Sequence, residues 1–216
     1  MLINFIYLLS FLTTIIYSTF YFRKNTEINL KYISVYLFFM FLSELLASFI
    51  AYLGYDNLWV YNSLTFIEFN CLFFFFRGII LSKRINEIVL YIVFVFNVIY
   101  LITNIYYLWL GSYLATYNSI ASISGSFFIS IVIFLFFRDF LYSDKILSYW
   151  RTLSFWMAFG LLVYYIGTIP ITSVLNSMIG LSKKIVSYLF NIQILLTIFM
   201  YCCFITGALW SQKRVK

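Results

Sequence analysis

The segment FFMFLSELLASFIAYLGYDNLWVYNSLTFIEFNCLFFFF, residues 38–76, decides the fold of this chain. Two long apolar stretches flank a short turn at residues 54–57, and each stretch contains one glutamate, Glu44 or Glu68. At about 1.5 Å per helical residue, both glutamates lie about 15–18 Å from the turn, near the middle of a hydrocarbon core about 30 Å thick. The pattern predicts a hairpin of two antiparallel membrane-spanning helices with two acidic side chains at one depth.

The composition of the whole chain agrees with this reading. The 216 residues are 64% hydrophobic and 10% charged, with a mean hydropathy of +0.99. Soluble domains are about half apolar and about a quarter charged, so the sequence indicates an all-α integral membrane protein. The connections between apolar stretches are short, and we therefore expect residues 1–216 to form one membrane domain without a separate soluble part.

Seven apolar stretches are long enough to cross a bilayer, which predicts a bundle of seven transmembrane helices. The expected spans are 2–22, 32–53, 58–76, 88–108, 120–137, 153–171 and 187–209. No basic residue precedes the first stretch and no small-residue cleavage site follows it, so we expect an uncleaved first span rather than a signal peptide.

The basic residues of the connecting segments predict the orientation of the bundle. Twelve of the fourteen fall in segments that share one side of the membrane, and only Lys183 and Lys184 fall on the other. By the positive-inside rule the N-terminus is outside and the C-terminus is cytoplasmic. The twelve are Arg23, Lys24, Lys31, Arg77, Lys83, Arg84, Arg138, Lys145, Arg151, Lys213, Arg214 and Lys216.

The placement of the net charge of +7 and the lack of histidine exclude several functions. The basic residues do not interleave with aromatic residues in a polar segment, so no nucleic-acid partner is expected. Without histidine or a CxxC pair, we expect no metal site and no cofactor. The three cysteines, Cys71, Cys202 and Cys203, lie in apolar stretches and are interpreted as small packing residues. We expect the protein to reside in a bacterial cytoplasmic membrane, with a eukaryotic endomembrane as the alternative location.

The chain contains signs of an internal repeat. Residues 1–82 align with residues 115–212, which leaves the span 88–108 as a connector. Both copies would begin outside, so the repeats would be parallel and related by an axis along the membrane normal. The aligned pairs are Lys31 with Arg151, Ser34 with Ser154, Phe39 with Phe159, Asn62 with Asn191, and Gly78 with Gly207.

A three-plus-one-plus-three arrangement is similar to that of the sugar-carrying SWEET proteins and, more broadly, of the seven-span transporter and opsin assemblage. The resemblance is one of topology, and the sequence departs from two motifs: Pro170 is followed by Ile171 instead of glutamine, and the span 187–209 has no lysine for a retinal Schiff base. Residues 155–167, FWMAFGLLVYYIG, also resemble a motif in seven-span proteins of Bacteroidota that carry no established activity.

The two glutamates are the strongest candidates for a functional site. An acidic side chain at mid-bilayer costs about 2.5–3.5 kcal/mol on insertion scales. No basic residue is an obvious partner for Glu44 or Glu68, so desolvation and mutual repulsion favour a shared proton on the pair. The pair could exchange a proton, hold a monovalent cation, or bind a cationic or hydroxyl-rich molecule. The alternative is a structural role, with both carboxyls protonated and hydrogen-bonded to neighbouring helices.

Polar side chains on three other spans are candidates for the same ligand- or ion-binding cavity. Asn97 and Asn104 lie seven residues apart on one helical face. Tyr164 occupies the repeat position of Glu44. Gln193 and Thr197 begin a stripe that continues to Tyr201, with Thr197 at the repeat position of Glu68.

Three functions fit this sequence. The first is a carrier or ligand-binding receptor with an acidic midplane site for a small molecule, proton or cation. The second is a signalling or scaffold subunit that works through a membrane protein partner, because the connecting loops are short. The third is an intramembrane enzyme acting on lipid. The chain lacks histidine and a GxSxG elbow, so we assign no catalytic residues and expect a non-enzymatic protein.

Overall fold

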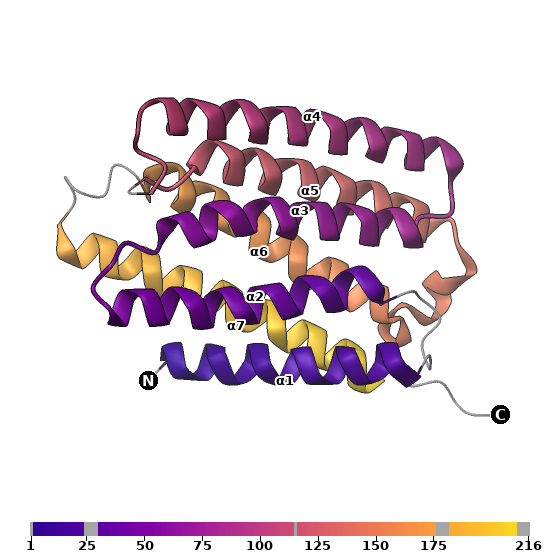
Figure 1. Ribbon diagram of the computed structural model, residues 1–216. Coiled ribbons are helices and arrows are strands. Elements are labelled where there is room, and N and C mark those ends of the chain that lie inside the picture. The colour runs from indigo at the N-terminus through magenta and orange to yellow at the C-terminus, as the bar shows by residue number, and fades with distance from the viewer. Residues whose placement is uncertain (1, 24–29, 115, 176–181, 211–216) are drawn as a thin grey trace.

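The computed structural model describes residues 2–23, 30–114, 116–175 and 182–210. These residues form seven long α-helices and one short 3₁₀ helix, without a strand among them (Figure 1). The all-α fold class is thereby confirmed. The elements are α1 (Leu2–Arg23), α2 (Lys31–Tyr52), α3 (Leu58–Ile79), α4 (Lys83–Trp109), α5 (Ser119–Leu141), η1 (Asp144–Arg151), α6 (Leu153–Leu175) and α7 (Lys183–Trp210).

By length and composition, the helices α2 to α7 can each cross a membrane, and α1 contributes a shorter apolar stretch, Leu8–Thr19. The protein is therefore a polytopic helical membrane protein. Most of the helices extend beyond the predicted spans, whereas α2 has the predicted length and is shifted by one residue. The largest difference is at α4, which begins at Lys83 instead of residue 88. A helix can continue into the headgroup region, because hydropathy marks only the part inside the hydrocarbon core.

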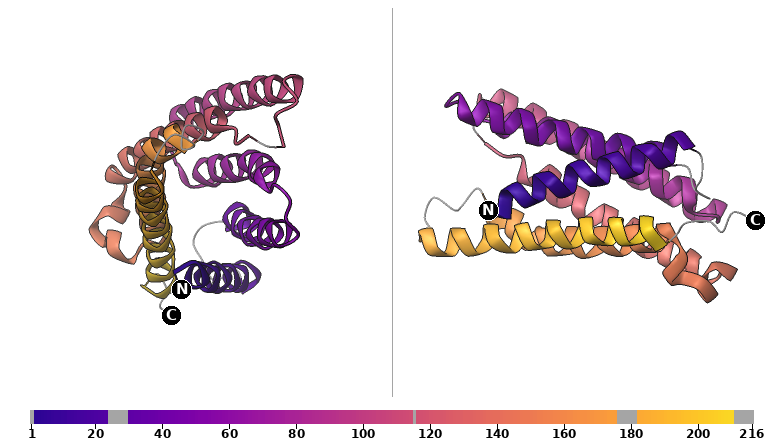
Figure 2. Two further views of the ribbon diagram at one scale, coloured as in Figure 1. Left: turned by 90° about the vertical axis from the view of Figure 1, so that its left-hand side faces the viewer. Right: turned by 90° about the horizontal axis from the view of Figure 1, so that it is seen from below.

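Six of the helices form a ring. Each one packs mainly on its neighbours in the order α1, α2, α3, α5, α6, α7, and α7 closes the ring against α1. Helix α4 lies outside the ring, where it packs on α3 and α5 (Figure 2, left). The chain thus places two three-helix units, α1–α3 and α5–α7, opposite each other with α4 at the periphery.

An aromatic core fills one half of the bundle. The rings of Phe69 and Phe73 pack on Phe96 with centroids 5.2 and 5.5 Å apart, and Phe76 packs on Phe136 at 5.6 Å. All five side chains are buried. This core joins α3, α4 and α5, because the aromatic residues of α3 point to both neighbours.

Short polar contacts fix the connections at both ends of the bundle. The side-chain amide of Asn62 on α3 donates to the backbone oxygens of Tyr113 at 3.1 Å and Thr116 at 2.9 Å, and its oxygen accepts from the backbone nitrogen of Asn118 at 2.8 Å. At the other end, Asp139 on α5 accepts a 2.7 Å hydrogen bond from the backbone nitrogen of Leu81. The α4–α5 and α3–α4 connections are therefore tied to neighbouring helices.

The helix order brings the ends of α3 and α5 and the starts of α4 and α6 to the same end of the bundle (Figure 1). Exposed Arg77, Arg84 and Arg138 belong to these segments, and exposed Arg151 ends η1 just before α6. Lys24, Lys213, Arg214 and Lys216 of the predicted basic side lie outside the described residues, as do positions 1, 115 and 212 of the predicted repeat bounds. The sequence did not predict η1, which is too short and too polar to register as a span.

Candidate functional site

A cavity of about 440 Å³ lies inside the helix ring. Side chains of α1, α2, α3, α6 and α7 contribute to its wall, together with Tyr117 just before α5. The wall includes the first residue of α3 and residues near the start of α1 and the end of α6, so the cavity extends toward the end of the bundle that holds the α2–α3 turn. The polar lining residues are Glu44, Tyr61, Tyr117, Tyr164, Thr172, Gln193, Thr197 and Tyr201; the apolar ones are Ile6, Met40, Leu58, Phe190, Ile194 and Met200.

Four of the seven candidate site residues meet in this cavity: Glu44, Tyr164, Gln193 and Thr197. Glu44 is partly buried, and its carboxyl interacts with Tyr61 of α3. Because these residues come from α2 and from the consecutive helices α6 and α7, the two halves of the chain converge on one space.

Glu68 is not among the lining residues. Its carboxyl accepts a 2.7 Å hydrogen bond from the hydroxyl of Tyr165, a buried residue of α6. The ring of Tyr164, in the cavity wall, packs against the ring of Tyr165 with centroids 5.0 Å apart. Tyrosine side chains thus connect the carboxyl in the cavity with the one behind it.

The two candidate asparagines of α4 lie away from the cavity. Asn97 forms a reciprocal pair of 3.0 Å hydrogen bonds with Asn70 on α3, and Asn104 donates to the backbone oxygen of Tyr100 at 2.8 Å. Since α4 packs outside the ring, these two residues reach α3 or their own helix. Asn97 has partners for its amide, whereas the Oδ1 of Asn104 is buried without a hydrogen-bond partner among the described residues.

The structure adds Tyr61, Tyr117 and Thr172 to the site, and Tyr165 behind it. Tyr61 precedes Glu68 by seven residues, a spacing that places both on one helical face. Tyr201 continues the stripe of Gln193 and Thr197, so a sequence signal existed for it. Tyr117 lies in a connection between helices, and no periodicity could have placed it.

Among the described residues, the cavity wall has one acidic side chain and no basic side chain. Within the described part of the chain, the side chains of Tyr164, Gln193 and Tyr201 make no hydrogen bond, although Tyr201 is only 3% exposed. Burial raises the pKa of Tyr117 to about 12, so its hydroxyl stays a neutral donor at physiological pH. The cavity therefore offers one carboxyl and several unused polar groups to an occupant.

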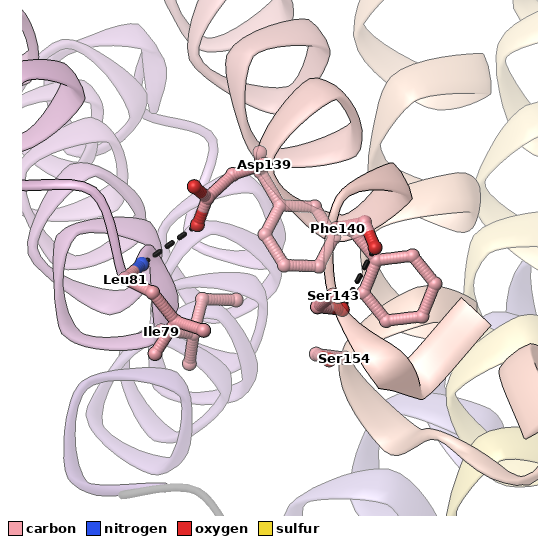
Figure 3. Close-up of a pocket in the computed structure, with 7 residues that line it drawn as sticks. Ile79, Leu81, Asp139, Phe140, Ser143 and Ser154 are labelled. Carbon is pink, nitrogen blue, oxygen red and sulfur yellow. Dashed lines mark hydrogen bonds between the residues drawn. The ribbon is translucent and has the colours of Figure 1, made fainter.

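A second cavity lies at the other end of the bundle, beside the Asp139–Leu81 contact (Figure 3). Its volume is about 20 Å³. A space of this size holds about one water molecule. Two of its polar side chains already have partners, since Asp139 accepts from Leu81 and the Ser143 hydroxyl donates to the Phe140 backbone oxygen at 2.7 Å. It is a structural feature of the helix connections.

The larger cavity is the candidate binding site of a polytopic helical membrane protein. In the described ranges, no group of three or more histidine, cysteine, aspartate or glutamate side chains is placed to hold a metal ion. Comparison with protein-family models, curated proteins and solved structures finds no match for this chain. The function is therefore inferred from the geometry of the site.

The Tyr165–Glu68 hydrogen bond gives a first testable prediction. Tyr165→Phe removes the donor and leaves a buried carboxyl oxygen without it, which costs about 1–3 kcal/mol of stability. We expect a lower melting temperature for Tyr165→Phe in detergent, and a smaller loss when the same change is made in a Glu68→Leu background. Equal losses in both backgrounds would show that the hydroxyl acts independently of Glu68.

Proposed function

We propose that this protein is a carrier that binds a small molecule in the Glu44 cavity. The observation that supports it is the position of the cavity between the two three-helix units. Glu44 and Tyr61 belong to the first unit, and Tyr164, Gln193 and Thr197 belong to the second. Secondary transporters bind their substrates between structural repeats near the bilayer midplane. A volume of about 440 Å³ falls in the range of small-molecule sites.

The packing of the helices supports a parallel repeat, as this proposal requires. If α1, α2 and α3 correspond to α5, α6 and α7, the contact of α1 with α7 corresponds to the contact of α5 with α3. Both contacts are present, as are the matching pairs α1–α2 with α5–α6 and α2–α3 with α6–α7. In the proposed topology all seven helices cross the membrane with the N-terminus outside, and the units meet along two seams.

Access to the cavity from each side of the membrane tests the proposal without knowledge of the substrate. Thr197→Cys is introduced into a chain that carries alanine at Cys71, Cys202 and Cys203, and the protein is reconstituted in vesicles of one orientation. A membrane-impermeant cationic methanethiosulfonate is then applied outside or trapped inside. We expect labelling from both faces, because a carrier exposes its site to each side in turn.

The controls separate a carrier from a receptor. Ala158→Cys, on α6 with no exposed surface, is expected to stay unlabelled. Labelling of Thr197→Cys from one face only would contradict transport and favour a ligand-binding receptor. Failure to label it from either face would contradict a water-accessible cavity, and with it any binding function for this site.

A further inference from the structure

The charge of the cavity wall restricts the chemical class of its occupant. Glu44 is the one carboxylic acid among the described lining residues, and these include no lysine or arginine. An anionic ligand would meet this carboxyl without a compensating cation, which is strongly unfavourable in a site of low dielectric constant. A ligand with a positive charge would pair with it.

The size of the cavity excludes a bare ion as the best fit. A volume of about 440 Å³ is within the range that holds organic molecules. Six apolar side chains line part of the wall, including Met40, Ile194 and Met200. A hydroxyl-rich molecule would leave hydroxyl groups without partners against them. A ligand that joins a positively charged head to an apolar body would match both the Glu44 carboxyl and the apolar side chains of the wall.

Tyrosine side chains share the cavity with the carboxyl of Glu44. Tyr61, Tyr164 and Tyr201 all line it, and Tyr61 interacts with the carboxyl. Aromatic faces attract ammonium groups within about 6 Å of the ring centroid. The hydroxyls of Tyr164 and Tyr201 and the amide of Gln193 have no partner among the described residues, and are open to a ligand.

We propose that the cavity binds an organic ammonium ion with an apolar body, its charged head paired with Glu44 among Tyr61, Tyr164 and Tyr201. This assignment rests on the proposed function in one respect, since the ligand must reach the cavity. It specifies what the carrier would recognise: a positive charge and an adjoining apolar group.

Three probes of similar shape and different charge test the assignment: 2-phenylethylammonium, 2-phenylethanol and phenylacetate. Binding to the purified full chain is measured by isothermal titration calorimetry in lipid nanodiscs at neutral pH. We expect saturable binding of the ammonium probe, weaker binding of the alcohol and none of the carboxylate. Glu44→Gln should weaken ammonium binding about ten- to hundredfold, because it removes a charge-assisted contact. Glu87→Gln, at an exposed position of α4, should leave it unchanged.

The role of the rings is tested at Tyr164. Tyr164→Phe keeps the aromatic face and should keep ammonium affinity, whereas Tyr164→Leu should lower it about two- to thirtyfold. Equal binding of the three probes, absence of ammonium binding to the wild type, or binding unaffected by Glu44→Gln would each overturn the assignment. If Thr197→Cys is nevertheless labelled from both faces, the carrier proposal survives and only the ligand class is wrong.

Discussion

Replacing Asn62 with alanine is expected to lower the free energy of unfolding by about 3 kcal/mol or more. The side chain satisfies three backbone groups of the α4–α5 connection, at Tyr113, Thr116 and Asn118. It is 1% exposed, so water cannot easily replace it. Each buried backbone group left without a partner costs about 1–3 kcal/mol.

The measurement is the thermal or detergent-induced unfolding of the purified protein, followed by tryptophan fluorescence. Asn191→Ala is the matched control, because Asn191 is exposed on α7 and an exposed substitution changes stability by about 0.5 kcal/mol or less. If Asn62→Ala lowers the free energy of unfolding no more than Asn191→Ala does, the α4–α5 connection keeps its conformation without the Asn62 hydrogen bonds. Tyr117 lies in this connection and in the cavity wall, so Asn62→Ala should also alter the labelling rate of Thr197→Cys.

Gly125→Ala is expected to destabilise the protein by about 1–3 kcal/mol through overpacking. A Cβ at this position on α5 would collide with the ring of Phe69 on α3. The ring cannot move freely, because it packs on Phe96 at 5.2 Å and on Tyr165 at 5.4 Å. Displacement of Phe69 would also disturb Tyr165, which holds Glu68.

A second glycine provides the control for this prediction. Gly78 is also helical, but a Cβ there meets no atom within 4 Å, so Gly78→Ala should be neutral or stabilising by about 0.5–1 kcal/mol. The melting temperatures of both variants are compared with that of the double variant Gly125→Ala/Phe69→Leu. The smaller side chain should restore part of the loss. If the Gly125→Ala variant is as stable as the Gly78→Ala variant, α3 and α5 can move apart to accommodate the added methyl group with little loss of stability.

The sequence by itself determined the class of the protein and the positions of its helices. Apolar stretches about 20 residues long specify helices in a membrane, because only a helix satisfies its backbone hydrogen bonds locally there. Every predicted span therefore corresponds to a helix in the structure. The two glutamates could also be identified from the sequence, because an acidic residue within an apolar stretch is recognised without knowledge of its neighbours in the fold.

Only the tertiary structure decided which polar residues share a site. Glu44 and Thr197 come together in the cavity, while Glu68 is held by Tyr165 and Asn97 pairs with Asn70 outside the ring. Helical periodicity gives the face of a residue on its own helix, but the order of helices around the ring depends on long-range packing. The displacement of α4 to the periphery removed its asparagines from the site. Closure of α7 against α1 completed the wall around the acidic residue that the sequence had already identified.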